Sequence, residues 1–153
     1  MRRGEISKGS RIEDKMRNPI APVVNNGVND TSPPGYQDQS FDYVYNIQLS
    51  ANQFLPDQIV AIYTYADFEM RAMIITVQTG LFSVRLSDGQ GYYLSNVLIN
   101  SFNLVGTPSD PFVFNPPVLY PAGGRIGIDI QDGSGSTNNV QLVFRGVNRY
   151  KRR

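Results

Sequence analysis

The chain has 153 residues, which is enough for one domain with its own core and short for two. It contains no cysteine and no histidine, so disulfides, thiolate zinc sites and histidine-dependent catalysis are excluded. The formal net charge of +1 is the balance of oppositely charged blocks. From this composition we expect no enzymatic activity, no metal site and no cofactor.

Neither a membrane span nor a secretory signal is predicted. No window approaches the roughly 20 apolar residues that cross a bilayer, and no apolar stretch follows the basic residues Arg2 and Arg3. We expect a soluble protein that is made inside the cell.

Residues 1–40 are predicted to form an extended N-terminal arm. They contain four prolines and isolated aliphatic residues, with no sustained helical or strand periodicity. Such a segment buries too little apolar surface to fold alone. Its first 17 residues hold six basic against three acidic residues, and the basic ones are candidate contacts to other subunits: Arg2, Arg3, Lys8, Arg11, Lys15 and Arg17.

A β-sandwich domain is predicted over residues 41–148. Apolar and mainly polar residues alternate from Phe41 to Ser50, which predicts a strand with one buried face. The run Asp88-Gly89-Gln90-Gly91 tolerates positive φ and predicts a hairpin. Further strands are predicted at residues 59–64, 70–79, 82–87, 92–94, 98–105, 125–130 and 140–145.

Prolines and polar turns shape the second half of this domain. Five prolines restrict residues 106–121 to short edge strands, and residues 132–139 form a long polar turn. About eight strands with frequent turns and no convincing helix predict an all-β fold. Its expected form is a single antiparallel β-sandwich of the jelly-roll type.

The last residues form a second basic block, predicted as a C-terminal tail over residues 149–153. Between the two basic blocks, residues 18–144 hold three arginines against ten acids. An acidic body with basic ends can attract copies of itself or another acidic surface. We therefore predict subunit contacts through Arg145, Arg149, Tyr150, Lys151, Arg152 and Arg153. The same tail combines cations with an aromatic ring, which leaves nucleic-acid contact open.

Tyrosines outnumber what a single core needs: Tyr36, Tyr63, Tyr65, Tyr92, Tyr93, Tyr120 and Tyr150. Tyrosine is favoured at protein interfaces, where one end of the side chain stays wet. Exposed tyrosines on a β-sandwich can also stack on sugar rings, and Tyr92 and Tyr93 are the candidates for that role.

The polar turn also offers oxygen donors for a cation. A calcium site needs six to eight oxygens, usually with several carboxylates in close order, whereas only Asp129 and Asp132 are near one another here. Turn chemistry alone accounts for these residues, so we expect no metal.

Four stretches between residues 60 and 150 carry a resemblance: YADFEMR at 65–71, TGLFSVRLSD at 79–88, YPAGG at 120–124 and FRGVNRY at 144–150. They resemble small virion structural proteins of tailed bacteriophages, of the head-decoration (cement) or neck (collar) type. The resemblance implies a β-sandwich subunit present in many copies on the head, neck or tail, with chain ends that contact neighbouring subunits. The resemblance assigns no catalytic role to any residue of this chain.

The leading prediction is a non-enzymatic structural subunit of a phage particle, assembled in the host cytoplasm and located in the virion. Its expected partners are copies of itself and other virion proteins, namely major capsid, portal, neck or tail subunits, with no membrane contact. The alternative is a carbohydrate-binding β-sandwich used for adsorption to a host surface. A third hypothesis is genome contact through the C-terminal tail.

Overall fold

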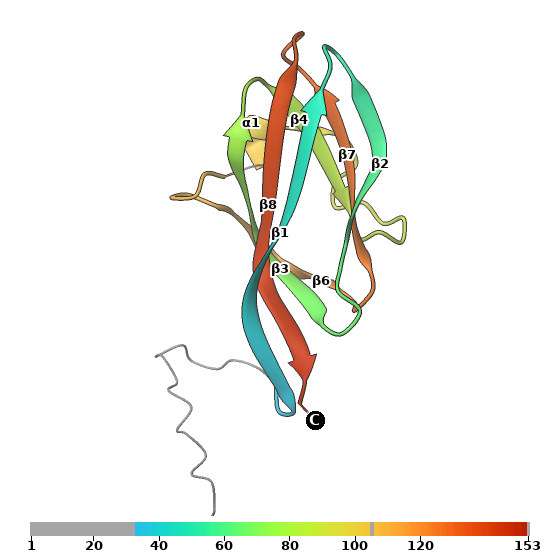
Figure 1. The fold of residues 1–153 in the computed structure, drawn as a ribbon, viewed down its shortest axis with the longest axis vertical. Helices are drawn as coiled ribbons and strands as arrows, with labels where there is room; N and C mark the ends of the chain where they lie inside the picture. The colour runs from blue at the N-terminus through green and yellow to red at the C-terminus, as the bar shows by residue number, and fades with distance from the viewer. Residues whose placement is uncertain (1–32, 105, 153) are drawn as a thin grey trace, which may run out of the picture.

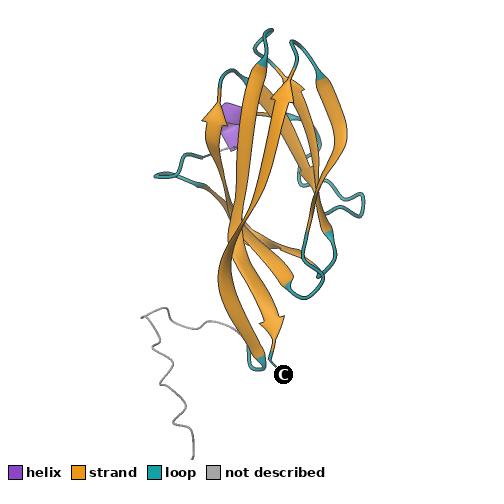
Figure 2. Cartoon of the chain, viewed as in Figure 1, coloured by secondary structure: helices purple, strands orange, loops and turns teal. Residues whose placement is uncertain are grey.

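A computed structural model describes residues 33–104 and 106–152, which form an all-β fold (Figures 1 and 2). These residues contain the strands β1 (Tyr36–Leu49), β2 (Phe54–Ala61), β3 (Asp67–Gln78), β4 (Phe82–Ser87), β5 (Ile99–Asn100), β6 (Phe112–Tyr120), β7 (Arg125–Asp132) and β8 (Asn138–Lys151). A single helical turn among them, α1 (Ser101–Leu104), follows β5 directly. Residues 1–32 of the predicted arm lie outside the described residues.

The strands form two antiparallel sheets. The first sheet has the order β1-β8-β3-β6, and the second has the order β2-β7-β4-β5. The pairs β1 with β8, β2 with β7, β3 with β6 and β4 with β5 describe one long hairpin that is rolled up into two layers. This topology is a jelly roll, so the predicted all-β antiparallel sandwich is confirmed.

The core lies between the two sheets, because the inward-facing positions of each strand are apolar. Its largest fully buried side chains include Phe68, Met70, Met73, Phe82, Tyr120, Ile126, Ile130 and Phe144. Burying one such side chain stabilises the fold by about 1.5–3 kcal/mol relative to leaving it exposed. The Tyr120 hydroxyl donates a hydrogen bond to the Ser87 carbonyl at 3.3 Å, so this tyrosine belongs to the core and not to an interface.

The segment between β4 and β6 differs from the prediction. Tyr93 forms only an isolated bridge with Ser87, and the strand predicted at residues 98–105 is reduced to Ile99 and Asn100. The chain then turns into α1, where the Asn100 side chain accepts a hydrogen bond from the Phe102 N–H at 3.0 Å. Such local side-chain hydrogen bonds compete with strand pairing. In the described ranges no helix has the length and apolar character needed to cross a bilayer.

The predicted turn at residues 88–91 and the predicted edge position of the proline-rich segment agree with the structure. Gly89 and Gly91 adopt φ values of 73° and 104° in the turn after β4, which the Asp88 N–H closes by donating to the Tyr92 carbonyl at 2.9 Å. The proline-rich β6 is an edge strand of the first sheet, as expected for a strand that lacks backbone donors, but with nine residues it is not the short strand predicted.

Both predicted limits of the sandwich need correction. β1 begins at Tyr36 and not at Phe41, and β8 continues through Arg149 to Lys151, so residues 36–40 are not arm and residues 149–151 are not tail. These positions lack apolar alternation, because polar side chains continue the inner face there: Gln37 and Gln39 on β1 and Asn148 on β8. The acids of β1 and the arginines of β8 meet across the ladder, as in the pair Asp38 and Arg149.

Candidate functional site

Both ends of the described chain lie at the same tip of the jelly roll (Figure 1). Tyr36 at the start of β1 pairs with Lys151 at the end of β8, and the Arg152 N–H donates to the Gly35 carbonyl at 2.8 Å. β3 joins this ladder only from Asp67, opposite Arg149. Residues 1–32 and Arg153 are therefore both connected to the chain at one tip.

Tyrosines from two elements form an aromatic row at this tip. Tyr150 stacks on Tyr65 with ring centroids 6.0 Å apart, and Tyr65 stacks on Tyr63 at 5.1 Å. The Tyr63 N–H donates to the Tyr43 hydroxyl at 3.0 Å, which fixes the loop between β2 and β3. Tyr65 is nonetheless 62% exposed. Partial desolvation, followed by the neighbours Tyr63 and Tyr150, raises the pKa of Tyr65.

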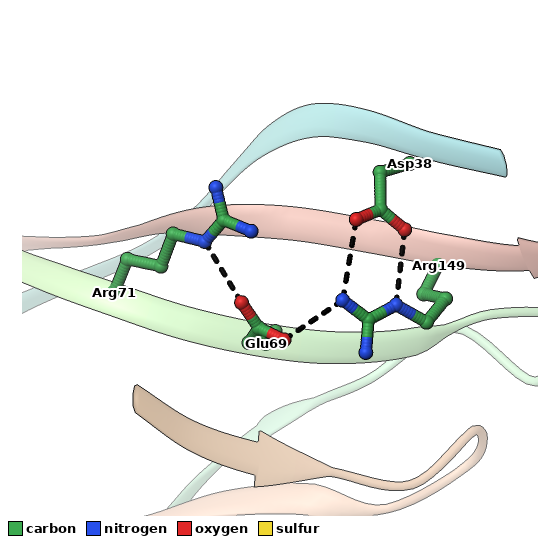
Figure 3. A network of polar contacts seen from close by, with 4 residues as sticks. All are labelled: Asp38, Glu69, Arg71 and Arg149. Carbon is green, nitrogen blue, oxygen red and sulfur yellow. Dashed lines mark hydrogen bonds and ion pairs between the residues drawn. The ribbon is translucent and has the colours of Figure 1, made fainter. Parts of the chain in front are cut away.

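An ion-pair network joins three strands beside this row (Figure 3). Arg149 donates through Nε and Nη2 to the two oxygens of Asp38 at 3.0 and 3.2 Å, and Nη2 also donates to Glu69 at 2.9 Å. Arg71 Nε donates to the other oxygen of Glu69 at 2.9 Å. The bond to Asp38 is the main cause of the raised pKa of Arg149. The network therefore ties β1, β8 and β3 together at the tip.

Arg145 and Arg149, two of the predicted subunit contacts, form ion pairs within the sandwich itself. Arg145 donates through Nε and Nη2 to the two oxygens of Asp42, at 3.2 Å each, and this interaction raises the pKa of Arg145. Asp42 lies directly opposite Arg145 in the ladder, and Asp38 lies opposite Arg149. Both arginines therefore balance acids of their own sandwich, which the linear charge pattern could not show.

Among the predicted contact residues that the structure describes, Arg145, Lys151 and Arg152 are exposed, and Tyr150 is half-buried in the aromatic row. We call Tyr63, Tyr65, Tyr150, Lys151 and Arg152 the tip surface. The sequence shows an excess of tyrosines but not that three of them stack, because Tyr65 and Tyr150 are far apart along the chain. The other predicted contact residues lie outside the described residues: Arg2, Arg3, Lys8, Arg11, Lys15, Arg17 and Arg153.

A hollow of about 360 Å³ lies on the outer face of the second sheet. In its lining, the buried Asp129 carboxylate accepts hydrogen bonds from the Asp57 N–H at 2.9 Å and from Arg85 Nη2 at 2.6 Å. Burial alone would raise the pKa of Asp129, but the bonds from Asp57 and Arg85 outweigh it and hold the pKa below its ordinary value. The carboxylate thus stays ionised. The polar and aromatic lining of the hollow includes Asp57, Gln58, Gln90, Tyr93, Arg125 and Asp129.

The two tyrosines predicted to stack on sugars differ in position. Tyr93 lines the hollow, and the guanidinium carbon of Arg85 lies 3.7 Å from its ring centroid, so one face of this ring is covered. Tyr92 is exposed but does not line the hollow. The floor includes Gly127, where any side chain would overlap the Ser87 hydroxyl. The structure therefore brings Tyr93, and not Tyr92, to a concave site.

The polar turn after β7 uses its oxygen atoms internally. Asp132 Oδ1 accepts hydrogen bonds from the Ser134 hydroxyl at 2.6 Å and from Asn138 Nδ2 at 3.2 Å. Oδ2 accepts from the N–H groups of Asn52 and Gly135, at 2.9 Å each. The bond from Ser134 is the main cause of the lowered pKa of Asp132. Within residues 33–104 and 106–152 no group of three or more acidic, histidine or cysteine residues could hold a metal ion.

Residues 33–104 and 106–152 thus form a jelly roll with an exposed aromatic and basic tip. Comparisons with family models, curated proteins and solved structures find no match. The function is therefore inferred from the geometry of the chain itself.

Proposed function

We propose that this chain is a non-enzymatic structural subunit of a tailed-phage particle, either a head-decorating cement protein or a neck or collar component. The tip surface carries this proposal, because it gathers stacked tyrosines and two exposed basic residues where both chain ends are connected. Tyrosine and arginine are enriched at the centres of protein interfaces. In the particle, this surface contacts copies of the chain or other virion proteins.

The architecture supports this role by analogy. Jelly rolls occur in virus capsid subunits, and also in lectins and cupins, so the fold alone does not select a function. The tip adds a specific feature. An exposed aromatic and basic surface can contact neighbouring subunits, and several linked weak contacts gain avidity.

Charge reversal at the tip tests the proposal. We expect Lys151→Glu to reduce incorporation of the full chain into particles by about tenfold, because a cation that faces an acidic neighbour becomes a repelling anion. Arg125→Glu is the matched control, since it makes the same charge change at an exposed residue of the second sheet. Incorporation is measured as the copy number in purified particles, by quantitative mass spectrometry.

Removing the aromatic row provides an independent check. Tyr65→Ala should also reduce incorporation, since it takes away the most exposed ring of the row and leaves the core unchanged. Circular dichroism establishes that each variant is folded. Normal copy numbers for both folded variants would show that the tip surface is not the contact.

The hollow on the second sheet favours carbohydrate binding as a second candidate function. Asp57, Gln58 and Arg125 present acceptors and donors around it, and Tyr93 supplies an aromatic wall. A concave site with a few convergent polar groups is the usual form of a small-ligand site. Adsorption to glycans of a host surface would use this site.

A glycan array separates the two candidates. Saturable binding that Tyr93→Ala abolishes and Tyr92→Ala preserves would support a sugar site in the hollow, because only Tyr93 lines it. Equal loss in both variants would place the sugar outside the hollow, and the absence of saturable binding would remove this candidate.

A further inference from the structure

The four sheet edges of the jelly roll are protected unequally. An edge strand presents unpaired backbone groups, and folds usually protect it by short length, proline or a bulge. β5 has only two residues, and β6 contains Pro116 and Pro117. β2 contains Pro56 and an irregularity at Asp57, which adopts a φ of 56°. Three of the four edges thus carry a device that discourages a further strand.

The remaining edge, β1, carries none of these devices. It is 14 residues long, with no proline, glycine or lysine. Its register with β8 is continuous from Tyr36 to Leu49, without a bulge. At about 3.3 Å per residue the strand extends for roughly 45 Å. Among the described residues β1 pairs with β8 alone, so its other side is a regular template for one more strand.

Apolar side chains along the same side of the sandwich are left partly exposed. β1 and β2 are the edges of their sheets on this side and contact each other. Apolar residues packed on the core are only half-buried here: Phe41, Tyr45 and Ile47 on β1, and Leu55 and Val60 on β2. A strand added to β1 would cover part of this surface, which adds a hydrophobic gain to the backbone hydrogen bonds.

We propose that β1 pairs antiparallel with β1 of a second copy, so that two first sheets join into one sheet across a two-fold axis. A two-fold contact uses the same patch on both copies and must be self-complementary. The strand meets this requirement, because its only charged residues, Asp38 and Asp42, lie in its first half. Antiparallel pairing therefore places the acidic half of one copy against the neutral half of the other.

Placing the two-fold axis at Tyr43 gives a register in which the acidic residues of one β1 face uncharged residues of the other. Asp38 then faces Gln48, and Asp42 faces Val44, so no two acids oppose each other. An axis at Asp42 would instead put like charges together, which is destabilising. Both acids are also neutralised within their own copy, by Arg149 and Arg145 respectively, so the approaching strand meets little net charge.

The test is the mass of the purified full chain over a range of concentrations, by sedimentation equilibrium. The wild-type chain should show a monomer–dimer equilibrium. In the register with the axis at Tyr43, Val44→Asp places a carboxylate directly opposite Asp42 of the second copy and should raise the dissociation constant by at least about tenfold. Val44 is 47% exposed, so the change leaves the core intact. Asn46→Asp, at another exposed position of β1, is the second variant, because position 46 then lies diagonal to Asp38 and Asp42 of the second copy. Val113→Asp is the matched control, since Val113 is 62% exposed on β6, the opposite edge of the same sheet.

Hydrogen exchange gives a second measurement. Amides of β1 should exchange more slowly in the dimer, whereas those of β6 should not change. A wild-type chain that stays monomeric at about 1 mM, a dimer that Val113→Asp disrupts and Val44→Asp does not, or unchanged exchange in β1 would each overturn the inference. The outcome does not depend on the virion role, because Lys151→Glu changes the tip surface and leaves the β1 edge intact.

Discussion

Replacing Gly146 with alanine is expected to destabilise the fold by about 3 kcal/mol or more. Gly146 lies inside β8, between Phe41 of β1 and Met70 of β3. A Cβ atom here would overlap the carbonyl oxygen of Glu69 and lie 2.9 Å from Cε2 of Phe68. Relief requires the backbone of β3 to move, and a close-packed sandwich resists such a shift.

Gly133→Ala is the matched control for this prediction. The nearest atom to a Cβ at position 133 would be the Leu81 carbonyl oxygen, at 3.5 Å, which is an ordinary contact. This variant should change stability by no more than about 0.5 kcal/mol. Urea unfolding measures both, with equal m-values showing that the midpoint shift reflects stability. Equal midpoints for the two variants would mean that β8 and β3 do not approach as closely as described.

The sequence predicts the fold class because strand periodicity is local. Alternation at Phe82–Ser87 and at residues 125–130 and 140–145 marks β4, β7 and β8, and the turn at residues 88–91 has the glycines that its φ values require. The order of the strands within each sheet cannot be predicted from such local patterns. Pairing of β1 with β8 joins the two ends of the domain, and no local pattern specifies such a long-range partner.

The start of β1 and the end of β8 are predicted wrongly for a related reason. Residues 149–151 look like a charged tail when taken alone, because the acids that balance Arg149 lie at position 38 and at position 69. Once β1 and β3 flank β8, the same charges become the outer face of a strand. The aromatic row is hidden in the same way, since Tyr65 and Tyr150 meet only after β3 has paired with β8.

Removing the guanidinium of Arg149 is the second large effect that the structure predicts. Arg149→Leu should destabilise the fold by about 2 kcal/mol. The side chains of Arg149, Asp38 and Glu69 are only 18%, 12% and 18% exposed, so the variant leaves two poorly solvated carboxylates without their shared cation. Glu69 keeps its bond from Arg71, and adding Asp38→Asn to Arg149→Leu should recover part of the loss, because one poorly solvated negative charge is then removed.

Arg145→Leu is the control that isolates the effect of burial. Arg145 makes the same two-bond contact with Asp42 on the same pair of strands, but these side chains are 48% and 39% exposed. Water screens such a pair, so its loss should cost less than about 1 kcal/mol. Urea midpoints at low and high salt compare the variants, and the small Arg145 effect should shrink further in salt. If Arg145→Leu proved as damaging as Arg149→Leu, burial would not be what makes the Arg149 network strong, and the expectation would be wrong.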